Sequence, residues 1–287
     1  LKKNARYLLM KGKNVMKNKI SGKIVALLLT LIIVATSGMP LYAKETGDKA
    51  NSFRYENGQS IAKAVPFSTL SPNAWKKIDG KYYSGDGSVI EGAVAKGIDV
   101  SHHQGTVDWK KAKEDGVEFA IIRCGFGMNQ TKQDDAQWFN NVKGCEENNI
   151  PYGVYLYSYA DTVKKAQSEA EHVLRLIKGH TLAYPVYYDI EEKAVLNKLT
   201  AEQLGKIAAT FVNKVKAEGY QTGIYSNKSN FETFLTDSQF SQWNKWVAQY
   251  NSAACTYKGT YQIWQAADTG TIDGVNGAVD INFAMKT

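Results

Sequence analysis

From Lys96 to its end, the chain alternates strand-like segments with helical stretches, and this order restricts the possible folds more than any other feature. Short runs rich in β-branched and aromatic residues predict eight strands, at 96–100, 119–124, 152–157, 185–189, 220–226, 246–250, 261–265 and 278–283. Apolar residues at three- and four-residue spacing predict helices at 107–115, 132–148, 162–178 and 200–218. Strands that alternate with helices favour a parallel sheet.

The number of strands bears on how the sheet closes. Eight strands within roughly 190 residues favour a closed barrel over an open sheet. Helical stretches become sparse after residue 225, so short loops should join the last strands. We therefore expect an α/β fold, namely an irregular TIM-like (β/α) barrel with fewer helices in its C-terminal part. In such barrels the active groups lie at the carboxyl ends of the strands.

Acidic residues mark the ends of several predicted strands. Asp189 and Glu191 follow a largely apolar run, and Asp99 lies near the end of the first predicted strand. In a strand, residues two apart share a face and lie about 6.6 Å apart at the backbone, so Asp189 and Glu191 should point together while Ile190 turns away. Asp280 lies within the last predicted strand. The pattern predicts four carboxylates in one place.

Such a group of carboxylates suits acid/base chemistry. Like charges at short range raise the pKa of one acid, which then stays protonated near neutral pH. Glycoside hydrolysis requires a protonated acid of this kind. Taken alone, however, Asp-x-Glu is a common triplet that also fits a solvated edge strand, and only its surroundings give it meaning.

Eight blocks of sequence, in this order and at this spacing, resemble those of glycoside hydrolase family 25, the Chalaropsis-type lysozymes. The resemblance covers residues 96–287. The blocks are Gly97-Ile-Asp99-Val-Ser101-His-His-Gln104-Gly105, Val107-Asp-Trp109, Ile121-Ile-Arg123-Cys-Gly125-Phe-Gly127, Pro151-Tyr-Gly153-Val-Tyr155-Leu-Tyr157-Ser-Tyr159, Asp189-Ile-Glu191, Trp246-Val-Ala-Gln-Tyr250, Ile263-Trp264-Gln265 and Val279-Asp280-Ile-Asn282.

The resemblance implies a role for each carboxylate. Glu191 takes the general-acid role and protonates the glycosidic oxygen as the bond to the leaving sugar breaks. Asp189 orients or stabilises the substrate's own 2-acetamido group, which attacks the anomeric carbon, and the reaction proceeds with net retention. Asp99 and Asp280 raise the pKa of the acid and hold the sugar. A direct nucleophilic role for Asp189 stays open.

Aromatic and polar residues near strand ends are expected to form the substrate groove. Aromatic rings stack on the apolar faces of sugars, although about half of these rings should belong to the core instead. The predicted substrate-binding residues are Tyr157, Tyr250, Trp246, Trp264, Arg123 and Gln265. Arg123 fits three roles: pairing with a cleft carboxylate, binding the lactyl or peptide carboxylate of the substrate, or a structural ion pair.

The implied activity is that of a peptidoglycan hydrolase, an N-acetylmuramidase that cleaves the β-1,4 bond after N-acetylmuramic acid. Its partner is the peptidoglycan glycan strand, and we expect a monomer without metal or organic cofactor; His102 and His103 complete no recognised zinc spacing. A non-catalytic glycan-binding module is one alternative, which the four carboxylates disfavour. A chitinase-like hydrolase is another, but Tyr184 and Tyr187 replace the first two aspartates of its Asp-x-x-Asp-x-Asp-x-Glu motif.

The charge of the chain is concentrated at its N-terminus. The net charge is +7, but residues 1–43 hold eight Lys or Arg and no acid, leaving 27 basic and 28 acidic residues in the remainder. We therefore expect no nucleic-acid partner. Basic residues before the apolar stretch 24–35, followed by Leu41-Tyr-Ala43, predict a cleaved secretion signal, because the stretch is shorter than the ~20 residues that span a bilayer. A retained anchor is the alternative. The processed protein should be secreted or associated with the cell wall, with no membrane contact.

The remaining chain should divide into two parts. Residues 44–94 read as a linker followed by a small aromatic hairpin around an Asp-Gly turn, either packed on the main domain or a single degenerate cell-wall-binding repeat. Residues 95–287 form the expected catalytic barrel. Three cysteines, Cys124, Cys145 and Cys255, allow at most one intrachain disulfide, and their pairing stays open.

Overall fold

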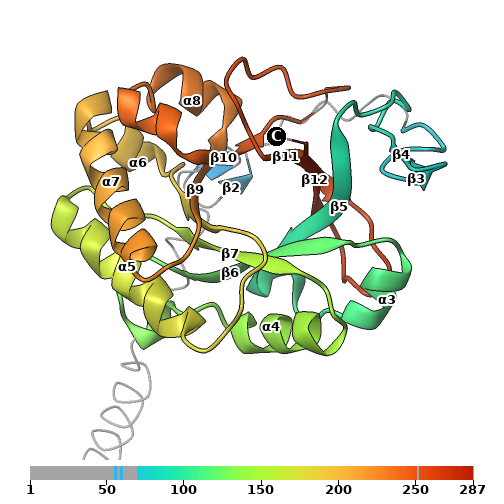
Figure 1. The fold of residues 1–287 in the computed structure, drawn as a ribbon, viewed down its shortest axis with the longest axis horizontal. Helices are drawn as coiled ribbons and strands as arrows, with labels where there is room; N and C mark the ends of the chain where they lie inside the picture. The colour runs from blue at the N-terminus through green and yellow to red at the C-terminus, as the bar shows by residue number, and fades with distance from the viewer. Residues whose placement is uncertain (1–54, 57–58, 61–69, 251, 287) are drawn as a thin grey trace, which may run out of the picture. The chain divides into compact units, whose positions relative to one another are not determined.

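The computed structural model describes residues 55–56, 59–60 and 70–286 apart from 251 (Figure 1). The predicted secretion signal of residues 1–43 and much of the predicted linker lie outside the described residues. Within the described part of the chain, no helix is long and apolar enough to cross a membrane.

Eight strands close into a barrel (Figure 1), with neighbours in the order β10-β11-β12-β5-β6-β7-β8-β9. The barrel strands are β5 (Ala93–Val100), β6 (Phe119–Phe126), β7 (Tyr152–Tyr157), β8 (Val186–Asp189), β9 (Thr222–Asn227), β10 (Asn244–Ala248), β11 (Ile263–Gly270) and β12 (Val279–Met285). All eight predicted strands exist within a few residues of their predicted bounds. The expected irregular α/β barrel is confirmed.

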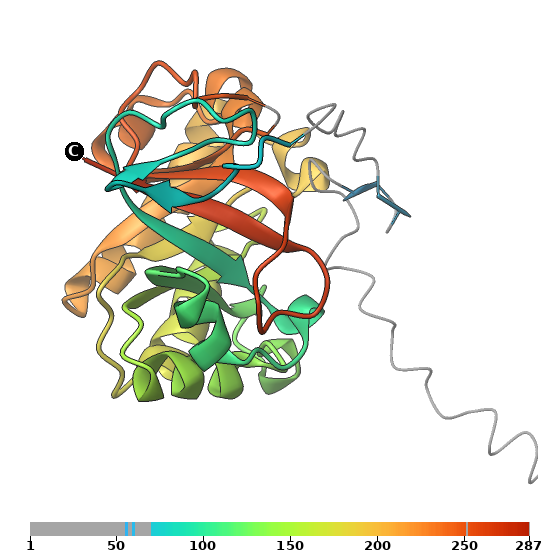
Figure 2. The same cartoon turned by 90° about the vertical axis from the view of Figure 1, so that its right-hand side faces the viewer.

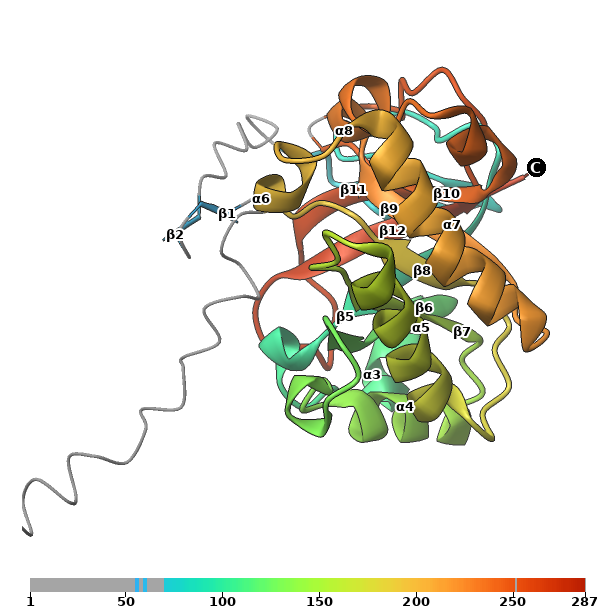
Figure 3. The ribbon, with the colours of Figure 1, turned by 90° about the vertical axis from the view of Figure 1, so that its left-hand side faces the viewer.

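Helices cover the outside of the barrel unevenly. They are α3 (Trp109–Glu114), α4 (Trp138–Glu147), α5 (Val163–Ile177), α6 (Lys193–Leu196), α7 (Ala201–Ala217) and α8 (Lys228–Thr233), with short 3-10 turns η1 (His102–Gln104), η2 (Thr131–Gln133) and η3 (Ser238–Gln242). Figure 3 shows the two longest, α5 and α7, side by side over one flank. The start of α7 is a capping box in which Thr200 and Gln203 bond each other's backbone N–H.

The last strand runs against its neighbours. β12 pairs antiparallel with both β11 and β5, whereas the other six pairs are parallel, so the barrel departs at this one strand from the parallel sheet that the sequence favours. Only residues 271–278 join β11 to β12, and a parallel crossover needs about a dozen residues or more. The reversed direction brings Asp280, near the start of β12, opposite Asp99, near the end of β5.

Side-chain alternation along the strands separates two apolar layers. The inner layer fills the barrel and consists of Phe119, Ile121, Tyr187, Tyr225, Trp246, Ala248, Ile263 and Ala284. The outer layer packs against the helices; Tyr188, for example, stacks on Phe211 of α7 with ring centroids 4.0 Å apart. Residues two apart on a strand share a face. The inward-facing residues that come after these apolar residues along each strand therefore lie at the rim of the barrel.

A hairpin before the barrel packs on the strands that lack a helix. It consists of β3 (Lys77–Ile78) and β4 (Lys81–Tyr82), joined by Asp79 and Gly80, both with positive φ, as a type I′ turn requires. The rings of Trp75 and Tyr82 contact Phe283 on the outer face of β12. In Figure 2 this segment lies beside β5 and β12. A second pair, β1 (Tyr55–Glu56) with β2 (Gln59–Ser60), precedes it.

All three cysteines are free thiols. Cys124 and Cys145 are fully buried in the outer apolar layer, and burial raises the pKa of both thiols. Cys124 therefore acts as a small core residue and does not line the pocket described below.

Candidate active site

A pocket of about 370 Å³ opens at the rim where the parallel strands end. All four predicted carboxylates line it, on the ends of β5 and β8, just after β8, and at the start of β12. The other lining residues are Val100, Ser101, His103, Gln104, Arg123, Tyr155, Tyr157, Tyr225, Trp246, Asp268, Asn276, Gly277 and Ala278. The structure thus brings together carboxylates that lie up to 181 positions apart in the chain.

Asp189 and Glu191 face the pocket together, as the strand period predicts. Both line it and are almost fully buried, while Ile190 between them lies in the outer apolar layer. The backbone here is held on both sides: Ile190 N–H donates to the Tyr225 carbonyl at 3.0 Å, and Ser226 Oγ donates to the Ile190 carbonyl at 2.7 Å. Ile190 therefore fixes the segment while its two neighbours present their carboxylates to the cavity.

Asp99 is held by two side-chain amides. Gln265 Nε2 and Asn282 Nδ2 each donate to Asp99 Oδ1 at 2.7 Å. These amides are oriented in turn, because Trp246 Nε1 donates to Asn282 Oδ1 at 2.8 Å and Tyr225 OH donates to Gln265 Oε1 at 2.7 Å. These contacts fix the orientation of the Asp99 carboxylate at the pocket.

Tyr157 lines the same pocket as the carboxylates. Its hydroxyl donates to Glu192 Oε2 at 3.3 Å, and the ring is almost fully buried. Burial, followed by the negative charge of Glu191, raises the pKa of Tyr157 well above its usual value. The group therefore remains a protonated hydrogen-bond donor at any working pH.

Three predicted substrate-binding residues lie differently from the expectation. Trp264 does not reach the pocket: it is 0% exposed, its ring belongs to the outer layer, and its Nε1 donates to the Gln249 carbonyl at 2.9 Å. The predicted contact of Trp264 with sugar is therefore wrong. Side chains alternate between the two faces of a strand, and on β11 Gln265 faces inward, so Trp264 faces outward. Gln265 contacts the pocket carboxylate Asp99, and Tyr250 contacts Gln265, because Tyr250 OH donates to Gln265 Oε1 at 2.5 Å. Neither lines the cavity.

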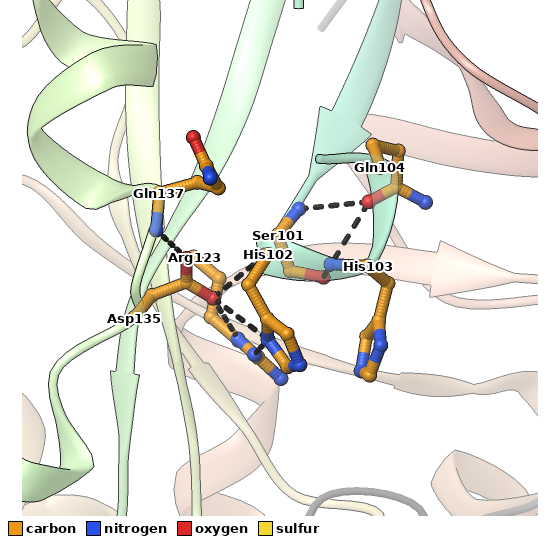
Figure 4. Close-up of polar contacts among 7 residues, drawn as sticks. All are labelled: Ser101, His102, His103, Gln104, Arg123, Asp135 and Gln137. Carbon is orange, nitrogen blue, oxygen red and sulfur yellow. Dashed lines mark hydrogen bonds and ion pairs between the residues drawn. The ribbon is translucent and has the colours of Figure 1, made fainter. Parts of the chain in front are cut away.

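Arg123 lines the pocket and forms a buried ion pair with a residue that sequence reasoning missed. Its Nε donates to Asp135 Oδ2 at 2.7 Å, and its Nη2 contacts His102 Nδ1 (Figure 4). The Asp135 carboxylate also accepts from the His102 backbone N–H at 3.0 Å and from that of Gln137 at 2.8 Å. Burial opposes the charge on Asp135, but the hydrogen bond with His102 and the charge of Arg123 prevail and lower its pKa to about 2.

Replacing Asp135 by Asn should destabilise the protein by about 3–5 kcal/mol at neutral pH, because the buried guanidinium loses its counter-charge. The folded pKa of about 2 lies below the unfolded value of about 3.9, so this carboxylate stabilises the fold above pH 4. Its contribution is lost as the pH falls toward 2. Urea unfolding at several pH values measures the free energy of unfolding. Between pH 4 and 2 this free energy should fall less in Asp135→Asn than in the wild type. Asp273→Asn, at an exposed position, should show the full wild-type fall. Parallel declines in wild type and Asp135→Asn would contradict the prediction.

Other residues of the site were also missed by sequence reasoning. Asn282 carried a usable signal, since it lies two residues after Asp280 and must share its strand face. Asp268, a fifth acidic residue lining the pocket, lies on β11 beyond an irregularity in its pairing with β12, which strand periodicity cannot follow. Across the described residues, no three His, Cys, Asp or Glu side chains form a group that could hold a metal ion.

Comparison with known proteins places this arrangement in a family. Residues 98–275 match the model for glycosyl hydrolases family 25. The chain is 31% identical over 193 residues to the uncharacterized protein YegX of Escherichia coli strain K12, covering 65% of this chain and 68% of YegX. It is 27% identical over 187 residues to the autolytic lysozyme of Clostridium acetobutylicum, covering 65% of this chain and 55% of that enzyme.

The fold is also found among solved structures. The modular autolysin LytC from Streptococcus pneumoniae, solved in complex with a synthetic peptidoglycan ligand, matches with a TM-score of 0.64 at 31% identity, over 73% of this chain and 52% of LytC. The chain thus corresponds to about half the length of that autolysin. Since the family model spans more than half of the chain and begins at the strand that carries Asp99, the chain belongs to the glycosyl hydrolases of family 25.

Proposed function

We propose that this protein is a peptidoglycan hydrolase, an N-acetylmuramidase that cleaves the β-1,4 bond between N-acetylmuramic acid and N-acetylglucosamine. The observation that carries the proposal is the pocket in which Asp189 and Glu191 face the same cavity as Asp99 and Asp280. Membership of the family, the lysozyme name of the Clostridium relative and the peptidoglycan ligand of LytC support the choice of substrate.

In the proposed reaction, Glu191 is the general acid. It transfers its proton to the glycosidic oxygen while the bond from that oxygen to the anomeric carbon breaks. The carbonyl oxygen of the substrate's 2-acetamido group attacks the anomeric carbon from the opposite face and forms a cyclic oxazolinium intermediate. Asp189 accepts a hydrogen bond from the acetamido N–H and stabilises the positive charge. Water then opens the ring, with Glu191 now acting as base, and the configuration is retained.

The surrounding residues prepare the acid for this task. Glu191 is almost fully buried and lines the pocket with the other carboxylates, so its side chain is positioned to act on the leaving oxygen in a site of limited solvent access. Asp99, fixed by Gln265 and Asn282, supplies a steady negative charge to the oxocarbenium-like transition state. Tyr157 and Trp246 offer a phenol and an aromatic face to the sugar.

Mass spectrometry of muropeptides tests the function directly. Purified cell wall digested by the protein should release fragments whose new reducing end is N-acetylmuramic acid. A reducing-end N-acetylglucosamine would identify a glucosaminidase instead and overturn the proposal. Binding of the wall without any release would favour the non-catalytic glycan-binding module, and cleavage of unsubstituted N-acetylglucosamine polymers alone would favour the chitinase-like alternative.

The setting of the enzyme is proposed from the sequence. Wall hydrolysis requires the protein to leave the cytoplasm, in agreement with the predicted secretion signal in residues 1–43 and with a secreted or wall-associated enzyme. We further propose that it acts as a monomer on glycan strands, without a metal or organic cofactor.

A further inference from the structure

Charges of both signs line the pocket. Five carboxylates line it: Asp99 near the end of β5, Asp189 and Glu191 at and just after the end of β8, Asp268 on β11 and Asp280 at the start of β12. The basic side chains that line the pocket within the described residues are Arg123, on β6, and His103, on the turn after β5. Arg123 and His103 attract a negatively charged part of a substrate, which the carboxylates on the strands around them repel.

The buried ion pair presents its positive end to the cavity. Arg123 lines the pocket, whereas its partner Asp135 lies behind it, with a side chain that is 0% exposed and outside the lining. Figure 4 shows the Asp135 carboxylate bridging the Arg123 guanidinium and the backbone of His102. An anion in the pocket can therefore contact Arg123, whereas Asp135 lies outside the lining.

The same carboxylate also fixes the turn that carries His103. Ser101 and Gln104 form a capping box around η1, in which His103 N–H donates to Ser101 Oγ at 3.3 Å and Ser101 N–H donates to Gln104 Oε1 at 2.9 Å. The rings of His102 and His103 lie 3.9 Å apart between centroids (Figure 4). His103 is exposed and lines the pocket, and its neighbour His102 is held by contacts with Arg123 and Asp135.

From this arrangement we propose that Arg123 and His103 together bind a carboxylate of the substituent on muramic acid. Asp135 is a positioning residue that holds Arg123 and the turn carrying His103 in place. The inference rests on the proposed function. Two sources supply this chemistry: the lactyl group itself when it carries no peptide, and the side-chain or terminal carboxylates of an attached peptide. Cationic side chains recognise both in the same way.

Three tetrasaccharides of alternating N-acetylglucosamine and N-acetylmuramic acid distinguish these sources. The first has free lactyl carboxylates, the second has them converted to N-methylamides, and the third carries an alanyl-glutamate dipeptide on each lactyl group. Wild-type enzyme should show a KM about tenfold lower for at least one carboxylate substrate than for the methylamide, as the loss of one charge-assisted hydrogen bond predicts. Preference for the first substrate identifies the lactyl group as the source, and preference for the third identifies the peptide.

His103→Ala, at an exposed position, should raise the KM for the preferred carboxylate substrate toward that of the methylamide. Arg123→Lys keeps the charge but loses the fork of donors, so it should weaken the preference as well. His180→Ala, a histidine outside the pocket lining, serves as the matched control and should keep the wild-type preference. Equal KM values for all three substrates in the wild type would contradict the proposal that Arg123 and His103 bind a substrate carboxylate. A full preference retained in His103→Ala would contradict it as well. Failure to cleave any of the three would instead count against the muramidase function itself.

Discussion

Glu191→Gln should abolish hydrolysis while leaving the fold and glycan binding nearly intact. The amide has the shape of the carboxylic acid but cannot deliver a proton, and loss of a positioned general acid costs about 10²- to 10⁴-fold in rate or more. Glu191 is 5% exposed and its neighbour Ile190 fixes the backbone, so the substitution leaves the apolar contacts in place. The release of reducing ends from purified wall measures the rate.

Two further measurements make the result specific to Glu191. Thermal unfolding and sedimentation with insoluble wall should match the wild type, which separates chemistry from folding and binding. Glu202→Gln, the same chemical change on the exposed surface of α7, should retain full activity. If purified, folded Glu191→Gln turns over at the wild-type rate, the general acid lies elsewhere in the pocket.

Asp189→Asn should slow hydrolysis by about 10²- to 10³-fold, the effect of removing one electrostatic partner of a charged transition state. In the proposed mechanism the substrate supplies its own nucleophile, so Asp189 stabilises the acetamido group and forms no bond to sugar. A substrate with hydroxyl in place of the 2-acetamido group should therefore be nearly inert with the wild type, although its other contacts with the groove remain.

Intact-protein mass spectrometry during turnover distinguishes this mechanism from direct attack by the enzyme. No covalent sugar should accumulate on the wild type. A glycosyl ester mapped to Asp189 by peptide analysis would establish Asp189 as the nucleophile and replace substrate assistance, while the muramidase function would stand. The hydroxyl-substituted substrate gives an independent readout, since rapid cleavage of it would exclude attack by the 2-acetamido group.

The local pattern of apolar and polar residues was sufficient to predict the strands of the barrel and the shared orientation of Asp189 and Glu191. Strand β7 occupies its predicted range, and Asp189 and Glu191 share the cavity because a two-residue period depends only on the strand itself. The same reasoning placed Trp264 wrongly. Proximity to a strand end does not determine which face of the barrel a ring occupies, and Trp264 packs outward while Gln265 faces inward.

Tertiary structure decided which distant residues meet. The short β11–β12 connection reverses β12, and this reversal alone brings Asp280 to the rim that Asp99 occupies. Asn282 reaches Asp99 across 183 positions, and Asp135 reaches Arg123 from the segment before α4. Sequence periodicity reports the face on which a side chain lies, whereas strand direction and barrel closure determine which faces converge. The sequence by itself therefore determined the barrel and its acid pair, while chain reversal and closure assembled the rest of the pocket.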